Sequence, residues 1–175
     1  MDTGAVITRG TIWLALLCYV AALALRAHSG MRGRNKARAL WLMGCLSFLA
    51  HIAAAFHFYH HWSHAAALED TRRQTLAQTG IDYGGGIYFN YLFALVWLTD
   101  CTPLAWRRGL LQEQHRAWYW FLHAFFLFMI FNATAVFGHG LAKPIGALVC
   151  AATIMWLWRA RSPLKGKNQQ RGRNV

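Results

Sequence analysis

Apolar residues occur along this chain in long runs that short polar segments separate. Five runs are rich enough in Leu, Ala, Phe and Trp to be membrane spans, at residues 5–25, 39–61, 86–106, 117–137 and 144–158. A helix needs about 20 mainly apolar residues to cross the hydrocarbon core of a bilayer. The pattern therefore predicts an all-α integral membrane protein, a single bundle of five transmembrane helices within residues 1–161.

The segment after the second run predicts a helical extension. Residues 65–79 contain good helix formers and neither Pro nor Gly, so we expect the helix of residues 39–61 to continue outward to about residue 78. Gly80 is expected to end it, and the glycines at residues 84–86 give a flexible entry into the third span.

Basic residues are distributed unevenly between the two sides of the predicted bundle. Fourteen of the eighteen Lys and Arg follow spans one, three and five, and the other side holds only Arg9, Arg72, Arg73 and Lys143. Because Lys and Arg concentrate in cytoplasmic loops, we expect the N-terminus outside, the C-terminus in the cytoplasm, and an inner-membrane location. Residues 162–175 are then a disordered basic tail near anionic lipid headgroups. The basic residues that give the net charge of +12 lie mainly at the predicted cytoplasmic ends of the spans. The charge therefore does not predict nucleic-acid binding.

Composition agrees with a membrane protein. Hydrophobic residues make up 57% of the chain and charged residues only 14%, whereas a soluble domain carries about a quarter charged residues. Tryptophans near the span ends predict an aromatic belt at the bilayer surfaces: Trp41, Trp62, Trp106, Trp118, Trp156 and Trp158. The cysteines form no C-x-x-C pair, and we expect them to be single apolar thiols: Cys18, Cys45, Cys101 and Cys150.

Four histidines lie within eight residues at the outer end of the second predicted span: His57, His60, His61 and His64. Imidazole is the commonest protein ligand for transition metals, and ionisable side chains within a span are costly and mark functional sites. On a continuous helix, which turns about 100° per residue, the four side chains share one face. The i, i+4 spacing of His57 and His61 is the one by which a helix presents two imidazoles to one metal.

These positions predict a metal site at the outer face of the bundle. The expected ligands come from the second span and from the outer end of the fourth: His57, His61, His64 and His139. Further ligands, or hydrogen-bond partners for the ligands, are available nearby: His60, Asn90, Glu69 and Asp70. The expected cofactor is a transition metal (Fe, Cu or Zn) or a single haem b. Alternatively, interfacial histidines bond only to water and lipid headgroups.

A second group of ionisable residues lies deeper in the predicted spans. Asp100 is near the cytoplasmic end of span three, and His123 is about two turns into span four. An Asp–His pair in lipid is expected to be either a proton relay or a buried structural hydrogen bond. His51, in the middle of span two, is expected to bond to another helix or to bind a metal.

Together these features predict a multi-pass membrane protein with a redox or electron-transfer role, because a bound cofactor would carry the chemistry of a chain with short loops. Two alternatives remain open. One is a metal-handling protein for transport or delivery, and the other is an accessory or assembly subunit without a cofactor. In each case the chain lies in the lipid bilayer, and we expect a homo-oligomer or a partner in a membrane complex. The pattern does not indicate whether the protein is an enzyme.

Overall fold

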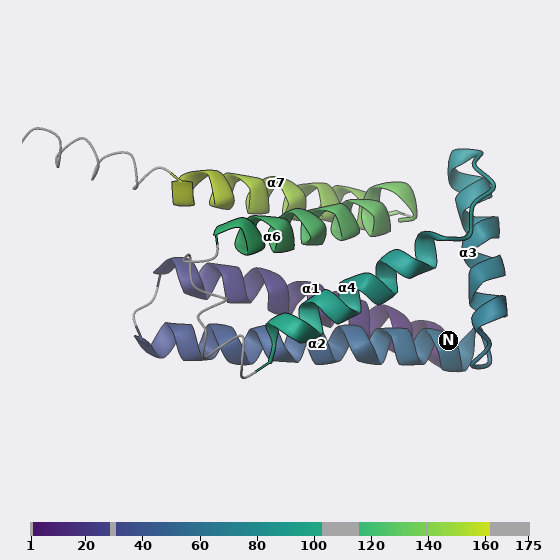
Figure 1. Cartoon of the computed structure of the whole chain (residues 1–175), viewed down its shortest axis with the longest axis horizontal. Coiled ribbons are helices and arrows are strands. Elements are labelled where there is room, and N and C mark those ends of the chain that lie inside the picture. Colours follow the sequence, from purple (N-terminus) through teal and green to yellow (C-terminus); the bar gives the residue numbers. More distant parts are fainter. Residues whose placement is uncertain (1, 29–30, 103–115, 139, 162–175) are drawn as a thin grey trace, which may run out of the picture. The chain divides into compact units, whose positions relative to one another are not determined.

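The computed structural model describes residues 2–28, 31–102, 116–138 and 140–161 (Figure 1). Every regular element within these ranges is a helix, which confirms the all-α class. The elements are α1 (Thr3–His28), α2 (Met31–Phe58), α3 (His64–Thr79), α4 (Gly86–Asp100), α6 (Arg116–Phe131), the π-helix η2 (Asn132–Val136) and α7 (Ala142–Arg161).

Three helical segments are long and apolar enough to cross a membrane: Thr3–Arg26, Gly33–Phe58 and Ala117–Ala135. This supports the membrane class, and so do large apolar side chains on the helix surfaces. Leu17 on α1 is 65% exposed and Leu95 on α4 is 61% exposed, which suits contact with lipid and not with water. The other two predicted spans correspond to the 15 residues of α4 and to the apolar segment Ala142–Trp158 of α7, which are shorter.

The chain divides into two compact units, Met1–Phe126 and Leu127–Val175. In the first unit, α1 and α2 lie side by side (Figure 1). Gly4 near the start of α1 is against Phe58 at the end of α2, and Tyr19 further along α1 packs on Trp41, with 5.9 Å between ring centroids. Residue numbers thus rise along α1 as they fall along α2, so the two helices are antiparallel.

The chain turns sharply between α2 and α3, where the sequence predicted one continuous helix. α2 ends at Phe58, and the backbone is left-handed at His61 (φ 47°) and at Trp62 (φ 60°). Ser63 then caps α3, because its hydroxyl oxygen accepts a hydrogen bond from the Ala66 N–H at 3.2 Å. Ser is a preferred N-cap residue. Figure 1 shows the result, an α3 that is directed away from the axis of α2.

Aromatic side chains from four helices fill the core of the first unit. Phe126 of α6, which is 2% exposed, stacks on Tyr19 of α1 with ring centroids 4.4 Å apart. It also contacts Phe93 and Trp97 of α4, both at 4.6 Å, and Trp41 of α2 at 5.2 Å. The first unit is therefore packed around one aromatic cluster.

The second unit joins the end of α6 to α7 through the π-helix. The Phe137 N–H bonds to the Asn132 carbonyl at 3.0 Å, the i→i+5 pattern of a π-helix. Thr134 in η2 is buried, and its hydroxyl donates to the Ile130 carbonyl at 2.6 Å. Gly146 of α7 lies directly against the Thr134 side chain. A small residue thus allows α7 to approach η2 closely, as is common between membrane helices.

Candidate functional site

The four histidines predicted to lie at the outer face, at residues 57–64, do not share one helical face. His57 is on the last turn of α2, His60 and His61 are in the turn, and His64 is the first residue of α3. The predicted shared face assumed an unbroken helix, and the left-handed backbone at His61 and Trp62 removes that condition. His57 and His61 are exposed to solvent or lipid.

His64 instead connects α3 to α4. Its Nδ1 is 3.0 Å from the hydroxyl oxygen of Tyr91, and its ring is 5.9 Å from that of Tyr88. Asn90, between the two tyrosines, is exposed. This contact explains part of the turn, because it holds the first residue of α3 beside the α4 helix.

The described residues do not assemble the predicted metal site. Among them, no three His, Cys, Asp or Glu side chains gather as a group that could hold a metal ion. His139, the ligand expected from the end of span four, lies outside the described residues. The carboxylates expected nearby, Glu69 and Asp70, are paired with arginines.

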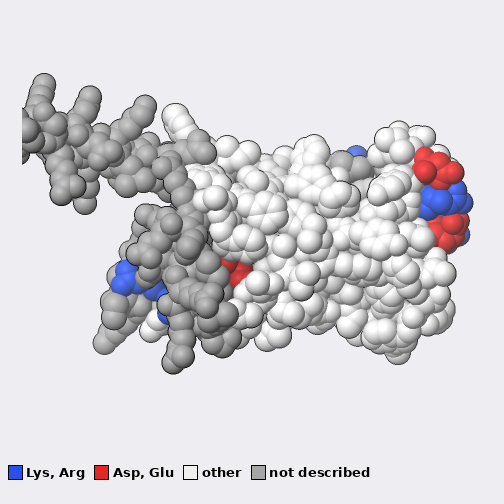
Figure 2. All heavy atoms as spheres, viewed as in Figure 1, with Lys and Arg blue, Asp and Glu red and all other residues white. Residues whose placement is uncertain are grey.

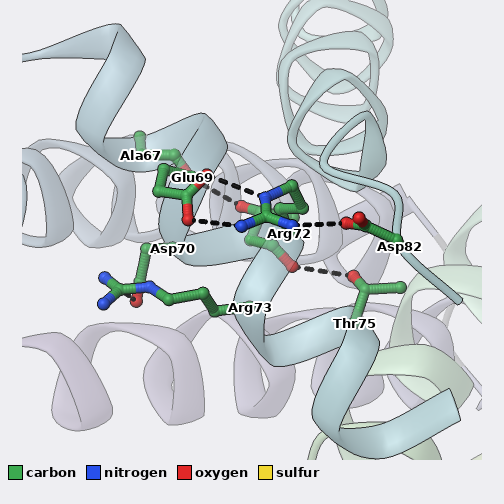
Figure 3. A network of polar contacts seen from close by, with 8 residues as sticks. Ala67, Glu69, Asp70, Arg72, Arg73, Thr75 and Asp82 are labelled. Carbon is green, nitrogen blue, oxygen red and sulfur yellow. Dashed lines mark hydrogen bonds and ion pairs between the residues drawn. The ribbon is translucent and has the colours of Figure 1, made fainter. Parts of the chain in front are cut away.

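Figure 2 shows acidic and basic side chains gathered over α3 at one end of the view, beside a mainly uncharged surface. Arg72 is the hub of this network (Figure 3). Its Nε and Nη2 each donate to the Glu69 carboxylate at 2.8 Å, and its Nη1 donates to Asp82 at 2.6 Å. Asp70 is also bonded, by Gln74 at 2.9 Å. The network joins α3 to the loop that leads into α4.

This network predicts a pH-dependent order of α3. The Arg72 guanidinium beside Glu69 lowers the pKa of that carboxyl, and its two acidic partners raise the pKa of Arg72. Because the pKa of Glu69 is lower in the folded than in the unfolded state, its stabilisation is present above the unfolded pKa and is lost as the pH falls through the folded one. We expect faster hydrogen exchange, corrected for the intrinsic rate, across residues 64–82 at about pH 3 than at about pH 6. The variant Glu69→Gln should show a smaller difference, and an equal difference would contradict the assignment.

His51 bonds to another helix, one of its two expected roles. Its Nδ1 is 2.9 Å from the backbone carbonyl oxygen of Thr8 in α1. Since a carbonyl oxygen can only accept, Nδ1 carries the proton and donates. The ring also stacks on Phe48, with 6.1 Å between centroids. His51 thus joins α2 to α1.

Asp100 is enclosed by side chains from three other helices. It is the last residue of α4 and is 1% exposed. Its Oδ1 accepts a hydrogen bond at 2.9 Å from Nε1 of Trp118, in the first turn of α6. Trp41 of α2 approaches the same carboxyl group, although neither Oδ2 nor the Trp41 Nε1 completes a well-formed hydrogen bond within the described part of the chain. Arg26 of α1 is within range of electrostatic attraction.

His123 of α6 pairs with Tyr19 of α1, and each is 1% exposed. The His123 Nδ1 is 3.2 Å from the Tyr19 hydroxyl oxygen. The Trp41 ring lies 6.3 Å from the His123 ring and 5.9 Å from the Tyr19 ring. Trp41 therefore links this pair to Asp100. We call these five residues the buried polar centre: Tyr19, Trp41, Asp100, Trp118 and His123.

Sequence reasoning found the two ionisable members of the centre and missed the three aromatic ones. Trp41 and Trp118 were predicted for the interfacial belt, yet Trp41 is 3% exposed and both face Asp100. A signal for Trp118 existed, since a buried carboxyl needs donors and Trp118 begins the next span. Tyr19 gave no signal, because its partner is 104 residues further along the chain.

The cysteines agree with their expected apolar role. Cys18, Cys45 and Cys101 are buried, Cys150 is half-buried, and all four are free thiols. Cys45 of α2 and Cys101, next to Asp100, are close neighbours beside the centre.

No family model matches the chain, and neither a curated protein nor a solved structure matches it significantly.

Proposed function

We propose that this chain is a five-span protein of the inner membrane that performs redox-linked proton transfer at its buried polar centre. In this proposal α4 and α7 join the three longer segments as membrane spans, with the N-terminus outside and the C-terminus in the cytoplasm. The uneven distribution of Lys and Arg supports this orientation. It puts Asp100 toward the cytoplasmic side, from which a proton could reach it.

The observation that carries the proposal is the burial of Asp100 and His123, each 1% exposed, within helices whose outer surfaces are apolar. Ionisable side chains are expensive in a membrane, and those retained there commonly serve proton relays or ion pathways. The centre provides a carboxyl, an imidazole and a phenol connected through Trp41. Each of the three can hold or pass a proton.

Redox chemistry requires an electron carrier in addition to these residues. In our proposal the carrier is an iron or copper ion or a single haem b, held by this chain or by a partner in a membrane complex. The outer histidines stay the proposed ligands where the chain itself binds it, with His139 completing the set. A homo-oligomer could bring further histidines to the same face.

The test begins with metal analysis and an ultraviolet–visible spectrum of protein purified from its native membrane with any bound partner. A redox titration at several pH values should then give a midpoint potential that falls by about 59 mV per pH unit, if one proton accompanies each electron. We expect Asp100→Asn and His123→Gln to flatten this slope, because they remove the groups that exchange the proton.

Asp82→Asn is the matched control, since it removes an exposed carboxyl outside the centre, and it should keep the full slope. A redox group whose potential is independent of pH would contradict proton coupling. Protein with neither metal nor haem, alone and with its partners, would instead favour an accessory or assembly subunit.

A further inference from the structure

We propose that Tyr19 and His123 form a proton-coupled redox pair, with Trp41 and Trp97 as the electron relay that reaches it. This inference rests on the proposed redox function and adds to it the path of the electron. In the oxidation step, the Tyr19 phenol loses one electron to a strong one-electron oxidant, a high-potential metal centre, and passes its proton to Nδ1 of His123. The products are a neutral tyrosyl radical, a protonated imidazole and the reduced oxidant, and the reverse step restores the phenol.

The geometry of the pair suits this step. The Tyr19 hydroxyl oxygen and the His123 Nδ1 are 3.2 Å apart, so the proton can move along an existing hydrogen bond. Both side chains are 1% exposed. An oxidised phenol that keeps its proton is a very strong acid, so it gives the proton up readily to a base within hydrogen-bond reach. The imidazole of His123 is such a base, because histidine commonly acts as a proton acceptor.

Packing holds the phenol in position. The Tyr19 ring stacks on Phe126 at an interplanar angle of 12°. Tyr119 packs on the other partner, His123, with ring centroids 4.4 Å apart. The hydrogen bond is therefore held by rings on both sides, so little reorganisation is needed when charge moves within the pair.

The relay consists of two indoles: Trp41, which contacts the pair, and Trp97, which contacts Trp41. Trp41 lies 5.9 Å from Tyr19, and Trp97 lies 5.6 Å from Trp41. Trp and Tyr are the aromatic side chains that lose an electron most readily, and these spacings are short for electron tunnelling. The indole Nε1 atoms of Trp41 and Trp97 are buried and make no hydrogen bond with the described residues. The Trp41 indole also approaches the Asp100 carboxyl, so the relay borders the rest of the buried polar centre.

The relay also explains how a buried phenol could react with a redox group elsewhere. Trp97 contacts Phe93 at 5.5 Å, and Phe93 contacts Phe48 at 4.9 Å. Phe48 in turn stacks on His51. Packed rings thus continue from the buried polar centre toward the part of α2 that leads to the outer histidines.

The test supplies its own oxidant, so it does not depend on the native redox group. Full-length protein in lipid nanodiscs is mixed with a ruthenium(III) polypyridyl complex generated by a laser flash. Radicals are followed by transient absorption and by electron paramagnetic resonance of freeze-trapped samples. To make the signal specific, Tyr19 is kept as the only tyrosine by changing the other five to Phe: Tyr59, Tyr83, Tyr88, Tyr91 and Tyr119.

This variant, in which Tyr19 is the only tyrosine, is the background protein. It should give a tyrosyl radical that the further change Tyr19→Phe abolishes. His123→Gln should slow radical formation by about 100-fold, the lower end of what a positioned base contributes, and should remove the solvent deuterium isotope effect. If His123 had only a structural role, the His123→Gln variant would keep the isotope effect. Trp41→Phe keeps a ring in the core and should slow the reaction, whereas Trp62→Phe, at a 66% exposed position, should not.

The pair is overturned if the background protein gives no radical beyond that of its Tyr19→Phe variant, or if His123→Gln leaves rate and isotope effect unchanged. Circular dichroism of each variant confirms that the fold is intact before the kinetics are compared. This outcome is distinct from failure of the proposed function. A native redox group with a pH-dependent potential would preserve that function and refute only the electron path through Tyr19.

Discussion

Phe126→Ala should lower the free energy of unfolding by about 3 kcal/mol. Phe126 contacts Tyr19, Phe93 and Trp97 at ring distances of 4.4–4.6 Å and is 2% exposed. Removing the ring leaves a cavity among side chains that cannot all move to fill it. We expect the lower end of the usual range for such a change, because in a membrane the lost term is packing and not transfer from water. Unfolding by SDS in mixed micelles measures the difference.

Phe131→Ala is the control for this change. Phe131 ends the same helix but is 56% exposed, so its loss should cost at most about 0.5 kcal/mol. Equal losses for the two variants would mean that the aromatic cluster does not hold the first unit together. The Phe126 variant should also disturb the Tyr19–His123 pair, since its ring stacks on Tyr19.

Gly146→Ala should destabilise the second unit by about 1–3 kcal/mol. A Cβ atom at this position would overlap with the Thr134 side chain. Thr134 cannot easily turn away, because it is buried and its hydroxyl is bonded to the Ile130 carbonyl. The α7 and η2 backbones must therefore separate. The same SDS titration, followed by hydrogen exchange of residues 131–158, localises the loss.

A double-mutant cycle makes this prediction specific. Thr134→Gly removes the atoms that the new methyl group meets, so in that background Gly146→Ala should cost much less. Gly10→Ala is the matched control, because nothing lies within 4 Å of a Cβ atom there. It should be neutral or stabilising by up to about 1 kcal/mol, since Ala favours a helix more than Gly does. Additive losses in the cycle would exclude the Gly146–Thr134 contact as the cause.

Local pattern predicted the helices well where one local signal dominates. Long apolar runs located α1, α6 and α7, and Gly80 ends α3 in a left-handed conformation (φ 75°), as glycine at that position indicates. The segment of residues 32–38, in which every second residue is Arg or Lys, precedes the predicted start of the second span, yet α2 begins at Met31. Arg and Lys are good helix formers, so the helix extends beyond its apolar part.

The turn between α2 and α3 shows where local pattern fails. His61 and Trp62 adopt a left-handed backbone, which such residues rarely prefer, and their sequence gave no sign of it. The Ser63 cap was a readable signal, but it competed with good helix formers on either side. Contacts from outside the segment, such as His64 with Tyr91, support the turn. The shared helical face predicted for the four histidines assumed an unbroken helix here, and the turn removes it.

The sequence by itself determined the membrane class of this protein, the positions of its long apolar helices and the two ionisable residues within them, Asp100 and His123. Hydropathy is a property of neighbouring residues, so the sequence alone reveals it. Each apolar span also forms its backbone hydrogen bonds internally, so its helix needs no partner from another segment. Only the tertiary structure decided which side chains meet. In spans that are apolar all round, no face is marked for the interior, so close contacts such as Gly44 against Trp97 set the rotation and register of each helix. Those contacts bring Tyr19 to His123 and Trp118 to Asp100.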